Sequence, residues 1–455
     1  MEFDTIAAIS TGLVPGGIGI VRVSGPRAVA VCEPLVRLRK GALSGSAANH
    51  LYYGKITDGE TVLDEALIAV LKAPHSYTAE DTVELQCHGG PYVLKRVLEA
   101  VIKAGARLAE PGEFTKRAFL NGRLDLSEAE AVMDLISSHT ELARETALKQ
   151  LQGAHSEKIR AMRAVILEKT AYLEAALDDP EHYELEGFAD EVSSAAKALR
   201  DEIRGLLRLA DNGRLLTEGV RTAIIGCPNV GKSSLLNRLL GFERAIVTQI
   251  PGTTRDTIEE SVRFGDLVLR LSDTAGIRES EDTVERIGIC RAREAIREAE
   301  LILLLTDGSK PFSKDDEALL ALCGGKKCLL LLNKADLGLA ETPESLEKHL
   351  KLPCFAVSAL SGGGLDAVLE KIRELFCLSE IRQQPLIVTN IRHKELLRQA
   401  ERSLSCVLDT VEAGAPEDLL TIDLMDAYRA LGQILGEEVE EDMINEIFGK
   451  FCMGK

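Results

Sequence analysis

The sequence predicts a multidomain protein of α/β plus all-α class, and three patterns in the chain predict it. Residues 1–120 alternate short apolar strands with turns. Residues 127–207 and 390–450 place apolar side chains at helical spacing. Between them, a glycine-rich loop at 226–233 follows an apolar run and precedes a helix-like segment, which is typical of a mostly parallel sheet. At about 150 residues per domain, a chain of 455 residues has room for about three domains.

The N-terminal region is expected to form an α/β domain over residues 1–120. Its apolar runs are short and bounded by turn residues, as at 18–23, 66–71 and 83–87. This pattern favours a sheet with connecting helices over an all-helical region.

The helical region is split in two by the central block. Before the block, Ile159, Met162 and Ile166 share one helix face, and after it residues 390–411 and 419–450 are again helical. The economical architecture inserts the block into a helical domain, because the termini of α/β domains usually lie close together. The expected domain ranges are 1–120, 121–215, 216–379 and 380–455.

The run Gly226-Cys227-Pro228-Asn229-Val230-Gly231-Lys232-Ser233 has the strand, loop and helix setting that a phosphate-binding loop requires. Its glycines let backbone N–H groups wrap phosphates, and Lys232 brings a positive charge to the β- and γ-phosphates. The Ser233 hydroxyl can bind Mg2+. A nucleotide is therefore the expected ligand.

Further motifs follow in the order that a guanine nucleotide site requires. Asp273-Thr274-Ala275-Gly276 comes directly after a strand-like run, so Asp273 can reach Mg2+ through water. In Asn333-Lys334-Ala335-Asp336, the Asp336 carboxylate can accept both hydrogen bonds from the N1 and N2 edge of guanine, a donor pair that adenine lacks. Lys334 can lie over the base plane, and Ser358-Ala359 supplies the last loop near the guanine oxygen. The set resembles the GTP-binding domain of translation-factor-like GTPases over residues 216–377.

A threonine-rich segment at 248–256 stands where the first switch is expected, and Thr254 is the natural second protein ligand for Mg2+. Ile277 occupies the place where many small GTPases carry a glutamine, and an aliphatic side chain cannot orient water. The residues expected at the nucleotide are Asn229, Val230, Gly231, Lys232, Ser233, Ser234, Thr248, Gln249, Ile250, Pro251, Gly252, Thr253, Thr254, Asp273, Thr274, Ala275, Gly276, Asn333, Lys334, Asp336, Ser358 and Ala359.

Asn229 resembles the asparagine with which potassium-activated GTPases hold K+ beside the β- and γ-phosphates. A fixed cation there can neutralise the charge that develops in the transition state, which is the task of an arginine finger elsewhere. An asparagine that only stabilises the turn is the alternative.

Motifs in three separate regions, together with the C-terminus, resemble the MnmE (TrmE) family of tRNA modification GTPases, which belongs to the TrmE/Era-like potassium-dependent GTPases. The matching segments are residues 17–25, 77–81, 84–90, 111–126 and 277–289, and the terminal Phe451-Cys452-Met453-Gly454-Lys455. The resemblance therefore spans the whole chain.

The resemblance implies that the N-terminal domain binds a tetrahydrofolate derivative, either 5-formyl or 5,10-methylene, and mediates dimerisation. Carried over position by position, the folate contacts are Arg22, Glu84, Arg123 and Lys455. The cationic side chains suit a glutamate-tailed ligand, and Glu84 can bond the donor edge of the pterin. Arg123 departs from the usual lysine but keeps its charge. An ordinary ion pair is the alternative for each of these residues.

The resemblance also implies the residues that assist hydrolysis. The implied potassium ligands are Asn229 and Thr253 through oxygens, with the backbone carbonyls of Thr248 and Ile250. Glu285 would orient the attacking water through a bridging water, with Glu281 and Asp282 as nearby competitors. Cys452 is either a nucleophile toward the uracil ring or a small buried residue that seats the terminus.

The implied function is K+-dependent GTP hydrolysis coupled to modification of C5 of the wobble uridine, position 34, in certain tRNAs. A homodimer would join an MnmG-like flavoprotein in a heterotetramer and add a carboxymethylaminomethyl or aminomethyl group. Folate would supply the one-carbon unit, while FAD and NADH would belong to the partner. The alternative is a GTP-controlled switch for ribosome assembly, but such relatives usually append an RNA-binding module such as a KH domain, and none is evident after Cys377.

The net charge of −18 argues against broad nonspecific binding of nucleic acid. A local basic patch or a partner protein must therefore supply much of the tRNA contact. The candidate patch is one helix face with Arg392, His393, Lys394, Arg398 and Arg402, and an ordinary solvated face is the alternative.

Composition also bears on location. No stretch reaches the roughly 20 apolar residues of a membrane span, and the N-terminus lacks a signal-like segment, so we expect a cytoplasmic protein without membrane contact. The 10 cysteines show no Cys-x-x-Cys pair and no zinc spacing, so reduced thiols are expected rather than disulfides or a structural metal.

Overall fold

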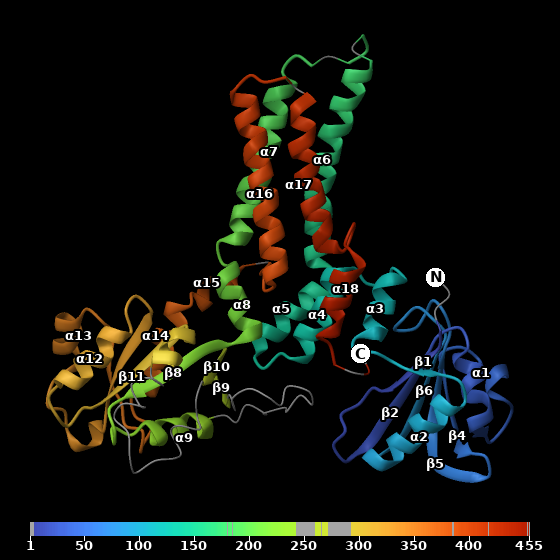
Figure 1. Cartoon of the computed structure of the whole chain (residues 1–455), viewed down its shortest axis with the longest axis horizontal. Helices are drawn as coiled ribbons and strands as arrows, with labels where there is room; N and C mark the ends of the chain where they lie inside the picture. The colour runs from blue at the N-terminus through green and yellow to red at the C-terminus, as the bar shows by residue number, and fades with distance from the viewer. Residues whose placement is uncertain are drawn as a thin grey trace. The chain divides into compact units, whose positions relative to one another are not determined.

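The computed structural model describes residues 4–179, 181–183, 185–242, 260–264, 266–271, 293–384, 386–416, 418–452 and 454. The chain divides into two compact units. Figure 1 labels the helices and strands of both. The first unit contains residues 1–133, 150–167 and 428–455, and the second contains 134–149 and 168–427. The predicted combination of α/β and all-α parts is confirmed. The domain ranges drawn from the sequence remain predictions.

The first unit is built around a sheet whose seven described strands have the order β3-β4-β5-β6-β2-β1-β7. Its strands are β1 (Ile6–Ile9), β2 (Gly16–Ser24), β3 (Val36–Leu38), β4 (His50–Asp58), β5 (Thr61–Leu71), β6 (Thr82–Gly89) and β7 (Arg107–Leu108). Neighbours are antiparallel except β1 and β7, which are parallel. The predicted strands at 18–23, 66–71 and 83–87 fall within β2, β5 and β6 and are confirmed.

This sheet has two unlike faces, because successive side chains of a strand point to opposite sides. One face carries buried residues such as Val21, which pack with α1 (Ala28–Cys32) and α2 (Pro91–Lys103) in one apolar cluster. The other face carries Arg22 directly opposite Glu84 on the neighbouring strand. Cross-strand partners share a face. The sheet therefore presents this pair on the side away from α1 and α2.

The C-terminal helix α18 (Glu441–Gly449) and the residues after it pack against two helices that follow the N-terminal sheet. These two helices are α3 (Glu113–Leu120) and α4 (Leu126–Ile136). Phe448 lies between Phe119 and Phe451, with ring centroids 6.2 and 5.1 Å away, respectively. Leu126 is fully buried in the same cluster. Aromatic packing thus holds the end of the chain within the first unit.

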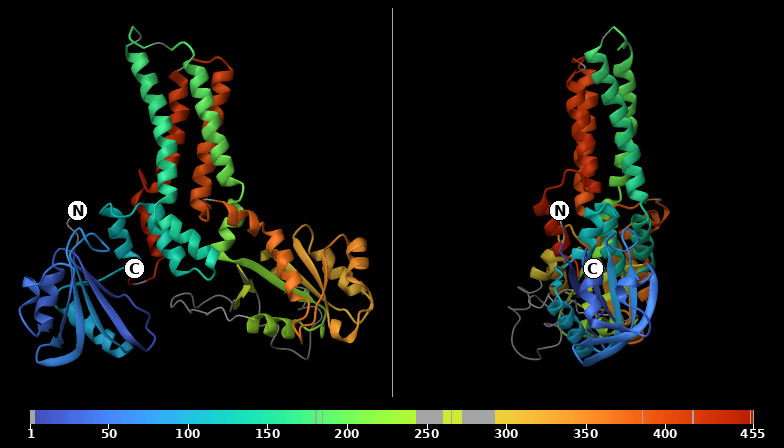
Figure 2. Two further views of the ribbon diagram at one scale, coloured as in Figure 1. Left: turned by 180° about the vertical axis from the view of Figure 1, so that it is seen from behind. Right: turned by 90° about the vertical axis from the view of Figure 1, so that its right-hand side faces the viewer.

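Long helices account for the stretches with helical periodicity, and those predictions are confirmed. They are α5 (Glu141–Leu151), α6 (Ala154–Asp178), α7 (Phe188–Leu207), α16 (Ile391–Glu412) and α17 (Asp418–Leu435). Within the second unit, α7 and α16 run side by side (Figure 2). Arg204 on α7 donates to Glu401 on α16 at 2.8 Å.

The second unit contains a mostly parallel sheet, as predicted, with the described strand order β13-β12-β11-β8-β10-β9. Its strands are β8 (Val220–Gly226), β9 (Glu260–Phe264), β10 (Leu267–Leu271), β11 (Leu301–Asp307), β12 (Lys327–Asn333) and β13 (Cys354–Ala356). All described neighbours in this sheet are parallel except β9 and β10, which are antiparallel. The carboxyl ends of its parallel strands meet at one edge, where such sheets bind ligands.

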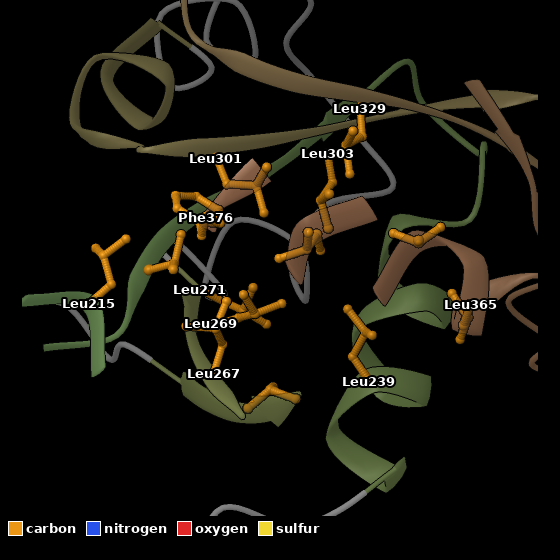
Figure 3. Close-up of a cluster of buried hydrophobic side chains, with 14 of the residues drawn as sticks. Leu215, Leu239, Leu267, Leu269, Leu271, Leu301, Leu303, Leu329, Leu365 and Phe376 are labelled. Carbon is orange, nitrogen blue, oxygen red and sulfur yellow. The ribbon is translucent and has the colours of Figure 1, made fainter. Parts of the chain in front are cut away.

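Both faces of this sheet are buried. Along β11, Leu301 and Leu303 belong to one core (Figure 3), whereas Ile302 and Leu304 belong to the other. Burial on both faces explains why β11 and β12 are continuous apolar runs. The helices around the sheet are α8 (Ala210–Glu218), α9 (Lys232–Phe242), α12 (Lys314–Leu322), α13 (Pro343–Leu350), α14 (Leu365–Leu375) and α15 (Leu378–Gln383).

Candidate functional site

The glycine-rich loop connects the end of β8 at Gly226 to the start of α9 at Lys232. A Cβ atom on Gly226 would lie 2.2 Å from the Leu305 carbonyl oxygen, so only glycine fits between the strands there. Gly231 has a φ of +100°, and a Cβ atom on it would lie 2.3 Å from Nδ2 of Asn333. These two glycines therefore let the loop approach its neighbours closely, as a phosphate-binding loop must.

The Lys232 ammonium folds back onto the loop that precedes it. Its Nζ donates to the carbonyl oxygens of Gly226 and Cys227, both at 2.8 Å. Burial lowers the pKa of Lys232, because the interior disfavours its charge. Ser233 and Ser234 are exposed in the first turn of α9, and the N-terminus of a helix favours an anion.

Asn333 ties the phosphate loop to the last predicted loop. The side chain is 3% exposed, and its Nδ2 donates to the Val230 carbonyl oxygen at 2.7 Å. Its Oδ1 accepts a hydrogen bond from the Ala359 backbone N–H at 2.9 Å. Three motifs that lie far apart in the sequence therefore meet at one buried amide.

The Asp336 carboxylate is held by a hydroxyl from the same last loop. Ser358 Oγ donates to Asp336 Oδ1 at 2.6 Å, and the Ser361 backbone N–H donates to Ser358 Oγ at 3.2 Å. Ser358 is buried, whereas Asp336 is exposed. The arrangement presents an oriented carboxylate to solvent, three residues after Asn333, which holds the phosphate loop. An oriented carboxylate suits recognition of a base edge.

Lys334 is paired with a carboxylate that the sequence motifs did not include. It has a φ of 63°, and its Nζ lies 2.8 Å from Asp307 Oδ2 at the end of β11. Two hydrogen bonds lower the pKa of Asp307 to about 2; the bond from Lys334 has the larger effect and the bond from Ser309 the smaller. Asp307 lies two residues after the apolar run that ends at Leu305, at the ligand-binding edge, and this position is the signal that could have identified it.

Several predicted site residues lie outside the described residues. They are Thr248, Gln249, Ile250, Pro251, Gly252, Thr253, Thr254, Asp273, Thr274, Ala275, Gly276, Glu285 and Lys455. Their roles in nucleotide, Mg2+, K+ or folate binding and in catalysis stay predictions.

The first unit brings together three of the four predicted folate contacts. Arg22 Nε donates to Glu84 Oε1 at 2.9 Å, and both side chains are mostly buried. The Arg22 guanidinium lies over the ring of Tyr77, 5.3 Å from its centroid. Arg123 lies over the same ring at 4.9 Å and donates to the Tyr77 carbonyl oxygen at 2.9 Å. Phe114 also lies beside Arg22, with its centroid 5.5 Å from the guanidinium carbon.

Tyr77 and Phe114 both occur in motifs that carried the family resemblance, yet the sequence assigned them no role. Their signal was an aromatic residue in each of two short motifs, at 77–81 and 111–126, that also contain or flank charged site residues. The contact with Arg22 depends on how β2 faces α3, which the sequence pattern does not give.

The terminal residues rest on the N-terminal sheet. The Gly112 backbone N–H donates to the Cys452 carbonyl oxygen at 3.4 Å. Gly454 has a φ of +86°, and a Cβ atom on it would lie 2.2 Å from the Ile9 carbonyl oxygen. Cys452 is half-buried. Both alternatives for Cys452, nucleophile or seating residue, remain open.

On the candidate basic face of α16, two cationic side chains pair with carboxylates and the histidine is buried. His393 is 2% exposed, Lys394 pairs with Asp211, and Arg398 pairs with Glu395 at 3.5 Å. These pairs favour the alternative of an ordinary helix surface. Among the helices that the structure describes, none combines the length and hydropathy that a bilayer span needs.

The parallel sheet, with the phosphate loop and the oriented Asp336 carboxylate at its carboxyl edge, defines a P-loop GTPase. Two family models match the chain: the MnmE helical domain over residues 126–452 and the GTP-binding protein TrmE N-terminus over residues 5–123. The chain belongs to the MnmE family of tRNA modification GTPases. This finding confirms the resemblance stated from the sequence.

Curated relatives match over their whole length. The chain is 48% identical over 458 residues to the tRNA modification GTPase MnmE of Lachnoclostridium phytofermentans, with 100% of both chains covered. It is 44% identical over 458 residues to the protein of the same name in Bacillus subtilis, covering 99% of this chain and 100% of the relative. The G domain of the T. maritima FeoB iron transporter is 28% identical over 34% of this chain and 97% of that chain, with a TM-score of 0.27.

Proposed function

We propose that this GTPase, with an MnmG-like flavoprotein, modifies C5 of the wobble uridine in certain tRNAs. The observation that carries the proposal is that one chain holds two separate arrangements of charged side chains. The Lys232, Asn333 and Asp336 set suits a guanine nucleotide, and the Arg22 and Arg123 pair suits an anionic cofactor. A GTP-controlled binding switch has no use for the second arrangement.

The residues of the first unit fit a tetrahydrofolate derivative. Two guanidinium groups share one ring, and only Arg22 has a carboxylate partner, Glu84, within this cluster of described residues. Excess positive charge suits the glutamate carboxylates of a folate, and Glu84 can accept from the pterin's donor edge. When bound, the folate supplies the one-carbon unit of the new C5 substituent. Lys455 completes the proposed set.

The described residues also fit the two proposed metal ions. Ser233 stands exposed in the first turn of α9, where a hydroxyl can reach Mg2+ beside the phosphates. Asn229 is exposed at the loop apex with a φ of 61°, so its side-chain oxygen is available to K+. Bound cations would offset charge on the phosphate oxygens. Thr254 would complete the Mg2+ ligands, and Thr248, Ile250 and Thr253 those of K+.

Hydrolysis needs an oriented water, and Ile277 cannot orient one. We assign this task to Glu285. Lys232 would hold the β- and γ-phosphates while the loop N–H groups wrap them. Asp336 would fix the base. Arginine fingers are unnecessary if K+ stands in their place.

The uncovered face of the first unit's sheet supports the proposed homodimer. Tyr53 lies opposite Leu67, and both are 42% exposed. Ile18 and Leu51 are 67% and 61% exposed. Exposed apolar side chains on a sheet, such as the directly opposed Tyr53 and Leu67, are typical of protein interfaces. FAD and NADH would be bound by the partner flavoprotein, and the complex would work in the cytoplasm.

Reconstitution tests the proposal. An unmodified tRNA is incubated with the chain and the FAD-containing flavoprotein. The mixture also contains NADH, 5,10-methylenetetrahydrofolate, GTP, K+ and an amine donor, which is ammonium or glycine. Nucleoside mass spectrometry should show C5-substituted uridine at position 34 only in the full mixture. Product formed without GTP hydrolysis, or equally well when Na+ replaces K+, would contradict the proposal.

A further inference from the structure

The ring of Tyr77 contacts the guanidinium groups of both Arg22 and Arg123. The guanidinium carbons of Arg22 and Arg123 are 5.3 and 4.9 Å from its ring centroid. Arg123 also donates to the Tyr77 carbonyl oxygen at 2.9 Å. One residue therefore contacts two cations that come from distant parts of the sequence.

The ring of Tyr77 is itself fixed. Its hydroxyl lies 2.8 Å from Oγ1 of Thr115, a fully buried residue on α3. The next residue, Thr78, is fully buried, and its Oγ1 lies 2.7 Å from Ser24 Oγ on β2. Asn121 Nδ2 donates to the Thr78 carbonyl oxygen at 2.7 Å. The hydroxyl of Tyr77 is therefore held by Thr115, and its backbone is held through the contacts of Thr78. Together these contacts fix the plane of the ring.

Two like charges beside one ring repel each other. The negative face of an aromatic ring attracts both, and Glu84 offsets only the charge of Arg22. Arginine side chains are long and lose conformational entropy when held in place. The ring lowers the cost of holding both guanidinium groups before a ligand arrives.

We infer that Tyr77 is the positioning residue of this site. It sets the spacing of the Arg22 and Arg123 guanidinium groups for the carboxylates of a reduced folate. The inference rests on the proposed function, because the ligand is the folate proposed above.

Calorimetric titration of the full-length chain with 5-formyltetrahydrofolate tests the inference. Tyr77→Leu removes the ring and should weaken binding about tenfold, as expected for the loss of two cation–π contacts. Tyr77→Phe keeps the ring and loses only the hydroxyl that lies 2.8 Å from Thr115 Oγ1, so it should weaken binding only about threefold. GTP affinity, measured in parallel, should be unchanged in both variants.

A double-mutant cycle separates positioning from general structural support. If Tyr77 acts through the arginines, Tyr77→Leu costs less affinity in an Arg123→Ala background than in the wild type. Fully additive losses would overturn the inference. If Tyr77→Leu lowers the thermal midpoint, Thr115→Val replaces it, since that variant keeps the ring but removes its anchor. A loss of about threefold is then expected, and unchanged affinity would overturn the inference.

The two proposals fail in different ways. Absence of 5-formyltetrahydrofolate binding by the wild-type chain would contradict the folate site itself. Wild-type binding combined with undiminished binding by Tyr77→Leu would leave the folate site standing and overturn the role of Tyr77.

Discussion

Asn333 donates a hydrogen bond to the carbonyl oxygen of Val230 across 2.7 Å and so joins the end of β12 to the phosphate loop. The same amide accepts from Ala359. A residue of the base-recognition motif, whose side chain is only 3% exposed, thus holds two loops together.

Asn333→Ala should lower both stability and nucleotide affinity. The substitution leaves the Val230 carbonyl and the Ala359 N–H without this partner, and an unsatisfied buried polar group costs about 1–3 kcal/mol. Urea denaturation and binding of a fluorescent GTP analogue measure the two effects. Asn237→Ala, at an exposed position on α9, is the matched control and should change neither. Equal behaviour of the two variants would contradict the role given to Asn333.

Asp336→Asn should shift the base preference of the site from guanine toward xanthine. The carboxylate, oriented by Ser358, accepts from the guanine N1 and N2 donors, and an amide cannot accept from both. GTP affinity should fall about a hundredfold with the loss of hydrogen bonds to a charged acceptor. Xanthosine triphosphate, with a carbonyl at position 2, should bind the variant better than the wild type. Competition binding measures both, and an unaltered preference for GTP would refute the assignment.

Gly432→Ala should destabilise the first unit. A Cβ atom on Gly432, within α17, would lie 3.0 Å from the guanidinium carbon of Arg163. That guanidinium is bound by Glu437 at 2.5 Å and lies 4.0 Å from the Tyr428 ring centroid, so it has little room to move. Overpacking of this kind costs about 1–3 kcal/mol.

The matched control is Gly205→Ala within α7, where a Cβ atom would meet nothing within 4 Å. Because alanine favours helix over glycine, this change should stabilise the chain by up to about 1 kcal/mol. Thermal denaturation compares the two variants. Shifts of the same sign would contradict the packing assigned to Arg163.

The ion pair of Asp307 and Lys334 should make stability depend on acid pH. The pKa of Asp307 is lowered from 3.8 to about 2 in the folded chain, so the unfolded chain binds a proton first as pH falls. Stability from this group is therefore present above about pH 4 and is lost as pH falls toward 2. Denaturant unfolding at several pH values should show that the difference in free energy of unfolding between wild type and Asp307→Asn narrows below pH 4. A difference that stays constant with pH would contradict the stabilising role of the Asp307–Lys334 ion pair.

Much of the second unit could be predicted from the sequence, because apolar runs such as those ending at Asn333 and near Asp307 mark strands buried on both faces. The order of motifs then predicts one ligand-binding edge. What the sequence could not give is which loops touch. The sequence predicts Asn333 among the nucleotide-binding residues, but its hydrogen bonds with Val230 and Ala359 depend on where three loops meet.

The N-terminal site shows the same limit. Arg22, Glu84 and Arg123 came from family resemblance, and the register of β2 against β6 places Arg22 opposite Glu84. The role of Tyr77 depends on packing between a loop and α3, which has no periodic signature in the sequence.

The most direct test of the account is mass spectrometry of tRNA nucleosides from cells that lack this chain. Cells are complemented with the intact gene, with Asp336→Asn, or with the control Asn237→Ala. The account predicts that C5-aminomethyl-type wobble uridines disappear and that only the intact gene and the control restore them. An unchanged nucleoside profile in cells without the chain would contradict the account and favour a ribosome-assembly switch.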